Sequence, residues 1–347
     1  MKQKLCITII LYLSLFLMQC QSDSPTPTST GGPKAQLFTK HPEPVWNGNL
    51  LAGDPSIIKI DDKLLMYYTT LAISGDGDGD NPDNLQVLIG VAESLDGINW
   101  EFAKPLILGE SIALKNDTTS WDKILETAFA IQKEDEVFLY YTGYSEEADG
   151  VNKIVAEGKI GLATSDDGLI FEKNSDAPLL LPDREYDDDG IFSPTIVEYE
   201  ETLYMIYTGW SLDVFGFGLF GATSEDGINW TKKGDLLLKE SDVPWALDNP
   251  RESELVAGPD GLFYLFFTND VAQNESAIGL ARSENPFGPW DVYQEPLIVK
   301  TKEWEESGLL APAVLIEDEQ IRMWYMAETG GFNNFFIGYA EIKFPEW

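Results

Sequence analysis

The stretch GDPSIIKIDDKLLMYYTT, from Gly53 to Thr70, sets a pattern that returns along the whole chain. A short apolar run, a polar turn and a second apolar run ending in two aromatics are followed by IGVAESLDGINWEF, from Ile89 to Phe102. Four later copies begin with ETAFAIQ, SPTIVEY, ESELVAG and APAVLIE. The equivalent positions are 72, 67, 59 and 59 residues apart when they are taken as Asp54, Glu126, Ser193, Glu252 and Ala311. Such a period predicts a ring of repeated units.

The first four copies each contain four short stretches with the alternation and aromatic content of β-strands, and no copy has a helical pattern. The sequence therefore predicts an all-β fold, a five-bladed β-propeller with one copy in each blade. The Asp-Gly pairs in SLDGINW and its variants suit tight hairpins, because both residues tolerate positive φ. The fifth copy lacks a fourth strand, so we expect residues 36–46, ahead of the first copy, to join the last blade and close the ring.

The first residues resemble a bacterial lipoprotein signal. Residues 1–20 carry two lysines, then an apolar stretch too short to span a membrane comfortably, and end in LMQC. We expect Cys20 to be lipidated, residues 21–35 to form a flexible Pro/Ser/Thr tether, and residues 36–347 to form the propeller. The expected location is extracytoplasmic, periplasmic or on the cell surface, with membrane contact only through the lipid anchor. An ordinary secretory signal is the alternative.

Charge excludes one class of partner. The 347 residues carry a net charge of −36, which repels a phosphate backbone over most of the surface, so nucleic acid is not an expected partner.

The only histidine is His41, which leaves no material for a Ser-His-Asp triad or a histidine-ligated zinc site. We expect a monomer.

Chemistry in a propeller is expected where first strands begin near the axis and where the loops between second and third strands return to the same face. The first-strand positions supply Asp54, Glu126 and Glu252, and Asp188 and Asp189 lie just before the third copy. Carboxyls held close together in a dry pocket take different pKa values, so one can act as an acid and another as a base or nucleophile. That arrangement suits glycoside cleavage, although axial polar residues also fill inert propellers.

The string DPSIIKIDDKLLMYYT resembles the first-blade motif of glycoside hydrolase families 43 and 32. PRESELVAGPDGLFYLFFT, from Pro250 to Thr268, resembles their fourth-blade motif. The resemblance implies that Asp54 is the general base or nucleophile and Glu252 the general acid. In those families a third carboxylate usually opens blade three as Asp-Pro. This chain has Ser193-Pro194 there, and Asp188, Asp189 or Glu126 could supply the missing charge.

Residues near the same face are candidate sugar contacts. Aromatic rings stack on the apolar faces of sugars, but they also fill blade interiors. The candidate substrate-binding residues are Trp46, Trp121, Tyr144, Trp210, Arg251, Asn269, Asp270 and Glu328. Tyr144 and Trp210 are the stronger aromatic candidates because they lie in loops.

One acidic loop offers a weak metal site. Asp76, Asp78 and Asp80 alternate as in a calcium loop, but Val87 stands where an EF-hand carries its bidentate glutamate. No cofactor is expected to be required, and Ca²⁺ is the one candidate ion.

The sequence thus leads to a glycoside hydrolase-like protein that acts on an arabinan, xylan or fructan type of glycan. Two alternatives remain open. One is a non-catalytic glycan-binding propeller that has lost the full carboxylate set. The other is a glycoside phosphorylase of the same architecture.

Overall fold

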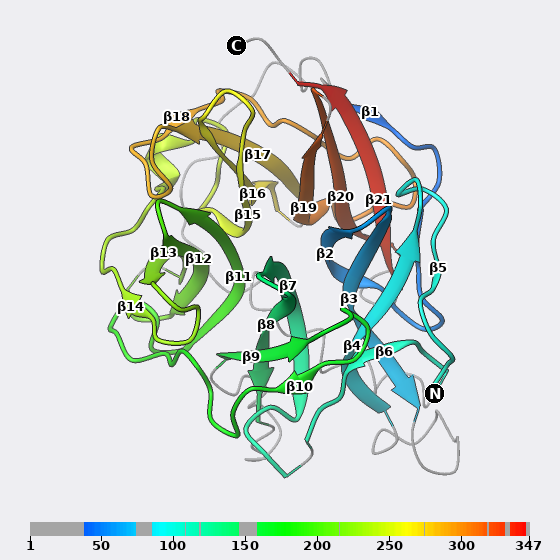
Figure 1. Cartoon of the computed structure of the whole chain (residues 1–347). Coiled ribbons are helices and arrows are strands. Elements are labelled where there is room, and N and C mark those ends of the chain that lie inside the picture. The colour runs from blue at the N-terminus through cyan, green and yellow to red at the C-terminus, as the bar shows by residue number, and fades with distance from the viewer. Residues whose placement is uncertain are drawn as a thin grey trace, which may run out of the picture.

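The computed structural model describes residues 38–73, 85–107, 109–117, 119–145, 158–214, 216–273, 275–317, 319–329 and 334–344. Within these residues the strands form five separate sheets, arranged as blades around one axis (Figure 1). Apart from one short 3₁₀ turn, η4 (Glu240–Asp242), the described elements are strands. None of the described helical segments is long and apolar enough to cross a membrane. The five-bladed β-propeller is confirmed.

The first strand of blades I to IV begins at the axis, and later strands lie progressively further out. Blade I contains β2 (Gly53–Ile60), β3 (Lys63–Ile73), β4 (Leu85–Ser94) and β5 (Glu101–Phe102), with β6 (Ile112–Leu114) also paired to β4. Blade II contains β7 (Ile124–Lys133), β8 (Glu136–Tyr144), β9 (Lys159–Ser165) and β10 (Glu172–Lys173). Blade III contains β11 (Gly190–Tyr199), β12 (Thr202–Ser211), β13 (Gly216–Ser224) and β14 (Thr231–Lys232). Blade IV contains β15 (Arg251–Ala257), β16 (Phe263–Ala272), β17 (Glu275–Ser283) and β18 (Asp291–Val292).

Blade V closes the ring, as the sequence predicted. Its strands are β19 (Leu309–Glu317), β20 (Gln320–Thr329), β21 (Asn334–Lys343) and the N-terminal β1 (Thr39–Lys40), which pairs with β21. The Lys40 ammonium lies 2.7 Å from a Glu305 carboxylate oxygen, and both side chains are buried. The Tyr325 hydroxyl donates to the same Glu305 carboxylate at 2.7 Å. This buried cluster joins the first strand of the chain to its last blade.

A β-bulge interrupts each first strand where it meets the axis. The bulged residues Asp54, Thr127, Ser193, Glu252 and Ala311 all have φ between 43° and 48°. Positive φ is uncommon outside glycine, and for a β-branched residue such as Thr127 it is an outlier that surrounding structure must enforce. The sequence-based equivalence is therefore wrong in blade II, because Thr127 occupies the axial position there and Glu126 precedes it. In that blade Glu126 still pairs with Thr142, and the register resumes at Phe129 with Tyr140.

Threonines on the second strands hold these bulges in place. The backbone N–H of Glu252 donates to the Thr208 hydroxyl at 2.9 Å, and that of Ala311 donates to Thr268 at 3.0 Å. The N–H of Thr127 donates to Thr69 at 3.1 Å in the same way. Each bond runs from one blade to the preceding one. The strained axial residues are therefore fixed by contacts between blades.

The Asp-Gly turns also connect neighbouring blades. The Gly168 carbonyl of blade II accepts from the Tyr67 hydroxyl of blade I at 2.8 Å, and the Gly227 carbonyl accepts from Tyr140 at 2.9 Å. At the junction of blades I and V, the Gly97 carbonyl accepts from the Trp324 indole at 2.8 Å. The Asp-Gly turns of blades I, II and III are therefore each bound by the first of two adjacent aromatic residues in the preceding blade: Trp324, Tyr67 and Tyr140, respectively.

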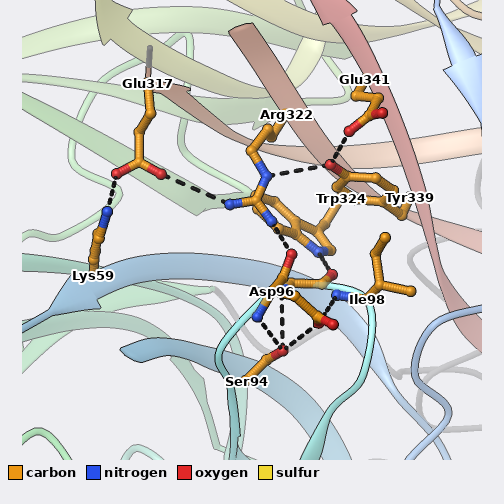
Figure 2. Close-up of polar contacts among 10 residues, drawn as sticks. Lys59, Ser94, Asp96, Ile98, Glu317, Arg322, Trp324, Tyr339 and Glu341 are labelled. Atoms are coloured by element: carbon orange, nitrogen blue, oxygen red, sulfur yellow. Dashed lines mark hydrogen bonds and ion pairs between the residues drawn. The ribbon is translucent and has the colours of Figure 1, made fainter. Parts of the chain in front are cut away.

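Figure 2 shows how charged side chains reinforce the junction of blades I and V. Arg322 donates to the Asp96 carbonyl and to the Tyr339 hydroxyl, and its guanidinium lies 5.1 Å from the Trp324 ring centre. Glu317 pairs with Lys59 of blade I at 2.7 Å. The Asp-Gly motifs are thus structural, as expected from sequence.

A tyrosine near the middle of the second strand binds a buried acid in its own blade. Tyr141 donates to Asp122, which also pairs with Lys173 at 2.6 Å, and Tyr207 donates to Asp187 in blade III. Trp121, just before Asp122, stacks on the Tyr141 ring with 12° between the planes. These repeated clusters stabilise the blades and lie away from the axis.

Candidate active site

Two cavities lie at the inner ends of the first strands, and Asp54 and Glu252 line both of them. The larger cavity is about 70 Å³ and is also lined by Glu126, Arg251 and Glu328. The smaller cavity, about 30 Å³, is lined by the five bulged residues and has room for about two or three water molecules. The two carboxyls that the family resemblance selected are therefore brought to one cavity, although they are 198 residues apart, from 54 to 252.

Asp54 is oriented by blade I and shifted electrostatically by blade IV. The Thr69 hydroxyl, on the next strand, donates to Asp54 Oδ2 at 2.8 Å. Burial, and after it the charge of Glu252, raise the pKa of Asp54 to about 7, although the Thr69 hydrogen bond opposes both. Asp54 can consequently gain or lose a proton near neutral pH.

Glu252 faces the cavity with an oxygen that is available to a ligand. Its Oε2 is buried and has no hydrogen-bond partner among the described residues. Burial raises the pKa of Glu252, and the positive charge of the adjacent Arg251 opposes that rise. A buried carboxylate oxygen without a partner is costly, so a substrate group or water that binds there is favoured.

Arg251 is a structural cation in the wall of the site. Its Nη2 lies 2.8 Å from Asp270 and its Nη1 lies 3.6 Å from Asp248, and only 2% of the residue is exposed. Burial raises the pKa of Asp248 to about 6 even though Arg251 lowers it. Asn269, which is also fully buried, donates to the Asp248 carbonyl at 3.0 Å. Asn269 and Asp270 thus support Arg251 and are not among the residues that line the cavity.

Glu126 lies off the axial ring but in the same cavity. It is 7% exposed, and burial raises its pKa to about 8, with the charge of Asp54 as the next cause. The hydroxyl of Tyr144, on the neighbouring strand β8, is a polar group beside this carboxyl and opposes the rise of its pKa. The two groups are not aligned as a hydrogen bond of standard geometry. Glu126 is therefore a third coupled carboxyl.

Asp189 is elsewhere. Its carboxylate accepts the backbone N–H of Leu212 at 2.7 Å in a loop and is not among the cavity residues. The neighbouring Asp187, which the sequence did not single out, is buried and pairs with Lys232 at 2.5 Å. The acidic run before blade III therefore serves the blade and does not replace the carboxyl missing at Ser193.

Most of the predicted aromatic contacts lie behind the cavity wall. Trp46 packs edge-on against Tyr68 and Phe102, and Trp121 stacks within blade II, so their placement does not support sugar contact. Tyr144 stacks on Phe192 with ring centres 5.8 Å apart. Trp210 stacks on Phe217 at the same distance, and it is Phe217 that reaches the cavity.

Sequence reasoning missed the apolar part of the cavity. It is formed by Leu51, Phe217, Leu310, Met326 and Phe335. Phe217 is the cross-strand partner of Trp210, and Phe335 is the partner of Glu328. The signal was present, because both phenylalanines open the third strand of their blades just after the loop that returns to the site.

Two predicted sites lie outside the described residues. These are the acidic loop with Asp76, Asp78 and Asp80, and the lipidation site Cys20. Within the described ranges, no group of three or more His, Cys, Asp or Glu side chains is arranged to hold a metal ion. Calcium binding by the loop stays a prediction.

The cavity combines titratable carboxyls with an apolar wall. Like charges close together cannot all ionise, so at neutral pH the carboxyls divide into proton holders and proton acceptors. Apolar side chains opposite them can contact the apolar face of a sugar ring. Acid/base cleavage of a glycosidic bond requires such a set of carboxyls beside a sugar-binding surface.

Solved structures of similar fold include glycoside hydrolases. The chain is similar to the crystal structure of a thermostable family-43 glycoside hydrolase, with 18% identity, a TM-score of 0.59, and 85% of this chain and 89% of that protein covered. It is also similar to an endo-arabinase from Bacteroides thetaiotaomicron with 17% identity and a TM-score of 0.59, over 85% of this chain and 95% of the other.

A third similar structure comes from the GH130 family of mannoside phosphorylases, which contains glycoside hydrolases that target β-1,2 mannosidic linkages in Candida mannan. It has 17% identity and a TM-score of 0.62, and 92% of this chain and 96% of that protein are covered. At these identities the three structures show a shared fold only. No curated protein sequence matches the chain. The family model for glycosyl hydrolases family 43 matches residues 43–334, and the chain belongs to that family.

Proposed function

We propose that the chain hydrolyses a glycosidic bond with Asp54 as base or nucleophile and Glu252 as acid. The observation that carries this proposal is that both carboxyls, from blades I and IV, line one cavity and that the charge of Glu252 acts on Asp54. Family 43 membership supports glycoside hydrolysis in general. The roles of the individual residues are part of the proposal.

Each carboxyl handles one proton of the reaction. In the inverting form Asp54 takes a proton from a water molecule while that water attacks the anomeric carbon. Glu252 gives its proton to the departing glycosidic oxygen, so the bond breaks without releasing an alkoxide. The raised pKa of Glu252 helps it keep that proton, and Thr69 holds the Asp54 carboxylate in place. In a retaining enzyme Asp54 would instead attack the sugar directly.

The substrate is a neutral glycan of the arabinan, xylan or fructan type. Four acids line the cavity against one cation, Arg251, whose charge is already offset by Asp248 and Asp270. An acidic sugar would be repelled there. The same balance disfavours a phosphorylase, since inorganic phosphate has no free cation to bind among these cavity residues.

The experiment is hydrolysis of arabinan, xylan and fructan panels by the wild type, Asp54→Asn and Glu252→Gln. We expect turnover by the wild type and a loss of about 10³-fold or more in each variant, with folding retained by circular dichroism. NMR of the first-formed anomer separates inversion from retention. Sugar binding without turnover would support the non-catalytic alternative, which the serine at position 193 favours. Turnover that requires phosphate would support the phosphorylase.

We also propose that the protein is held at an extracytoplasmic membrane face by a lipid on Cys20. The basis is the sequence of residues 1–20. Metabolic labelling with palmitate, with Cys20→Ser as the control, tests it. Equal labelling of the two proteins would contradict the proposal.

A further inference from the structure

The axial ring provides only two carboxyls, and the third comes from a position beside the ring. Blade III, where the resemblance implies a third acid, has Ser193, whose hydroxyl is buried without a partner among the described residues. Its backbone N–H donates to the hydroxyls of Thr127 and Thr142 at 3.2 and 3.3 Å. Glu126, next to Thr127, lines the larger cavity with Asp54 and Glu252. Blade II therefore supplies an acid, from the position before its bulge, to a site that blade III leaves incomplete.

The surroundings of Glu126 are acidic or uncharged on nearly every side. Strand β2 presents Asp54, β8 presents Tyr144, and β3 presents the hydroxyl of Thr69. Across the cavity, β15 presents Arg251 and Glu252, and β20 presents Glu328. The one cation in this set is engaged by Asp248 and Asp270.

Of the three coupled carboxyls, Glu126 is the one whose ionised form is least supported. Asp54 accepts a hydrogen bond from Thr69, and Glu252 lies next to Arg251. Glu126 is buried in the cavity wall beside Asp54, and burial and the charges of Asp54 and Glu252 raise its pKa, which only the uncharged Tyr144 hydroxyl opposes. A carboxyl in such surroundings keeps its proton while its neighbour ionises.

We propose that Glu126 takes the place of the missing blade III carboxyl: it remains protonated beside Asp54 and donates a hydrogen bond to a hydroxyl of the bound sugar. A neutral Glu126 adds no negative charge next to Asp54, which can then ionise as the base. This inference rests on the proposed function and assigns to the same site a third residue, from a different blade.

The proposal has a consequence for pH dependence. Activity then requires two protons in the free enzyme, one on Glu252 as acid and one on Glu126 as donor to the sugar. On the alkaline side, log(kcat/KM) should therefore fall with a slope approaching about −2. The slope gives the number of protons that activity requires, so it distinguishes a chemical role of Glu126 from a purely structural one.

The test compares pH profiles of wild type and Glu126→Gln. Glutamine keeps the shape and a donor but cannot ionise, so we expect kcat within about threefold of wild type at the optimum and an alkaline slope reduced to about −1. Glu126→Ala, which removes the donor, should raise KM about tenfold or more. The matched control is Glu136→Gln at the exposed start of β8, which should reproduce the wild-type profile. An unchanged slope in Glu126→Gln overturns the proposal, and so does a 10³-fold loss of kcat, because the latter would make Glu126 the acid.

A second readout does not depend on turnover. Infrared spectra at pH 7 should contain a protonated-carboxyl band that is absent from Glu126→Gln and present in Glu136→Gln. If no glycan is cleaved but the band behaves in this way, the hydrolase assignment fails and the protonated Glu126 stands. If glycans are cleaved and the band is unchanged in Glu126→Gln, the hydrolase assignment stands and the protonated Glu126 is ruled out.

Discussion

Replacing Asp54 with asparagine should stabilise the protein at alkaline pH while it abolishes turnover. The pKa of Asp54 is raised from 3.8 to about 7, so the fold favours its neutral form. That preference is fully present below pH 4 and is lost as the pH rises through 7, because only the unfolded chain then ionises freely. A shift of about three units corresponds to about 4 kcal/mol at 1.36 kcal/mol per unit. Because the residue is partly exposed, we expect about 2–4 kcal/mol.

Thermal unfolding measures this effect. For roughly 300 folded residues with about 2.1 cal/mol/K of unfolding entropy each, the gain corresponds to a Tm rise of about 3–6 °C at pH 8. At pH 4 the two proteins should differ by about 1 °C or less, since Asp54 is protonated in the folded state and the unfolded chain has only begun to ionise it. Asp62→Asn, in an exposed turn of the same blade, controls for the change in net charge. A Tm difference that is the same at pH 4 and pH 8, or a less stable variant at pH 8, would refute the reasoning.

Three further predictions concern the supports of the site. Arg251→Met should move the alkaline limb of kcat/KM to higher pH, because the cation that lowers the pKa of Glu252 is lost; a limb that stays in place would contradict this. Thr208→Val leaves the Glu252 N–H without its acceptor and should cost about 1–3 kcal/mol in urea unfolding, against less than about 0.5 kcal/mol for Thr202→Val on the same strand. Glu305→Ala leaves Lys40 buried and unpaired and should lower the free energy of unfolding by about 3–5 kcal/mol. The control Glu93→Ala breaks the exposed pair with Lys63 and should lower it by under about 1 kcal/mol. Equal losses would argue against ring closure through Lys40.

Repetition made the fold readable from sequence. The copies share the order of their apolar runs, and three of them carry an Asp-Gly turn. The same chemistry recurs in the structure, as when Tyr67 and Tyr140 each donate to the turn of the next blade. The prediction that the N-terminal segment closes blade V also followed from the repeat, because one copy lacked a strand. Asp54 and Glu252 could be selected because each opens a first strand within a motif that resembles family 43.

What the sequence alone determined was therefore the ring and the two carboxyls placed at equivalent points of the repeat. Only the tertiary structure decided which other residues join them. Every first strand carries the same bulge, and in blade II the bulged residue is Thr127, so Glu126 lies one position before it. The apolar wall depends on which member of a stacked cross-strand pair borders the cavity, and that is Phe217 and not Trp210. Local patterns repeat with the chain, whereas side-chain direction at a bulge is set by contacts between blades.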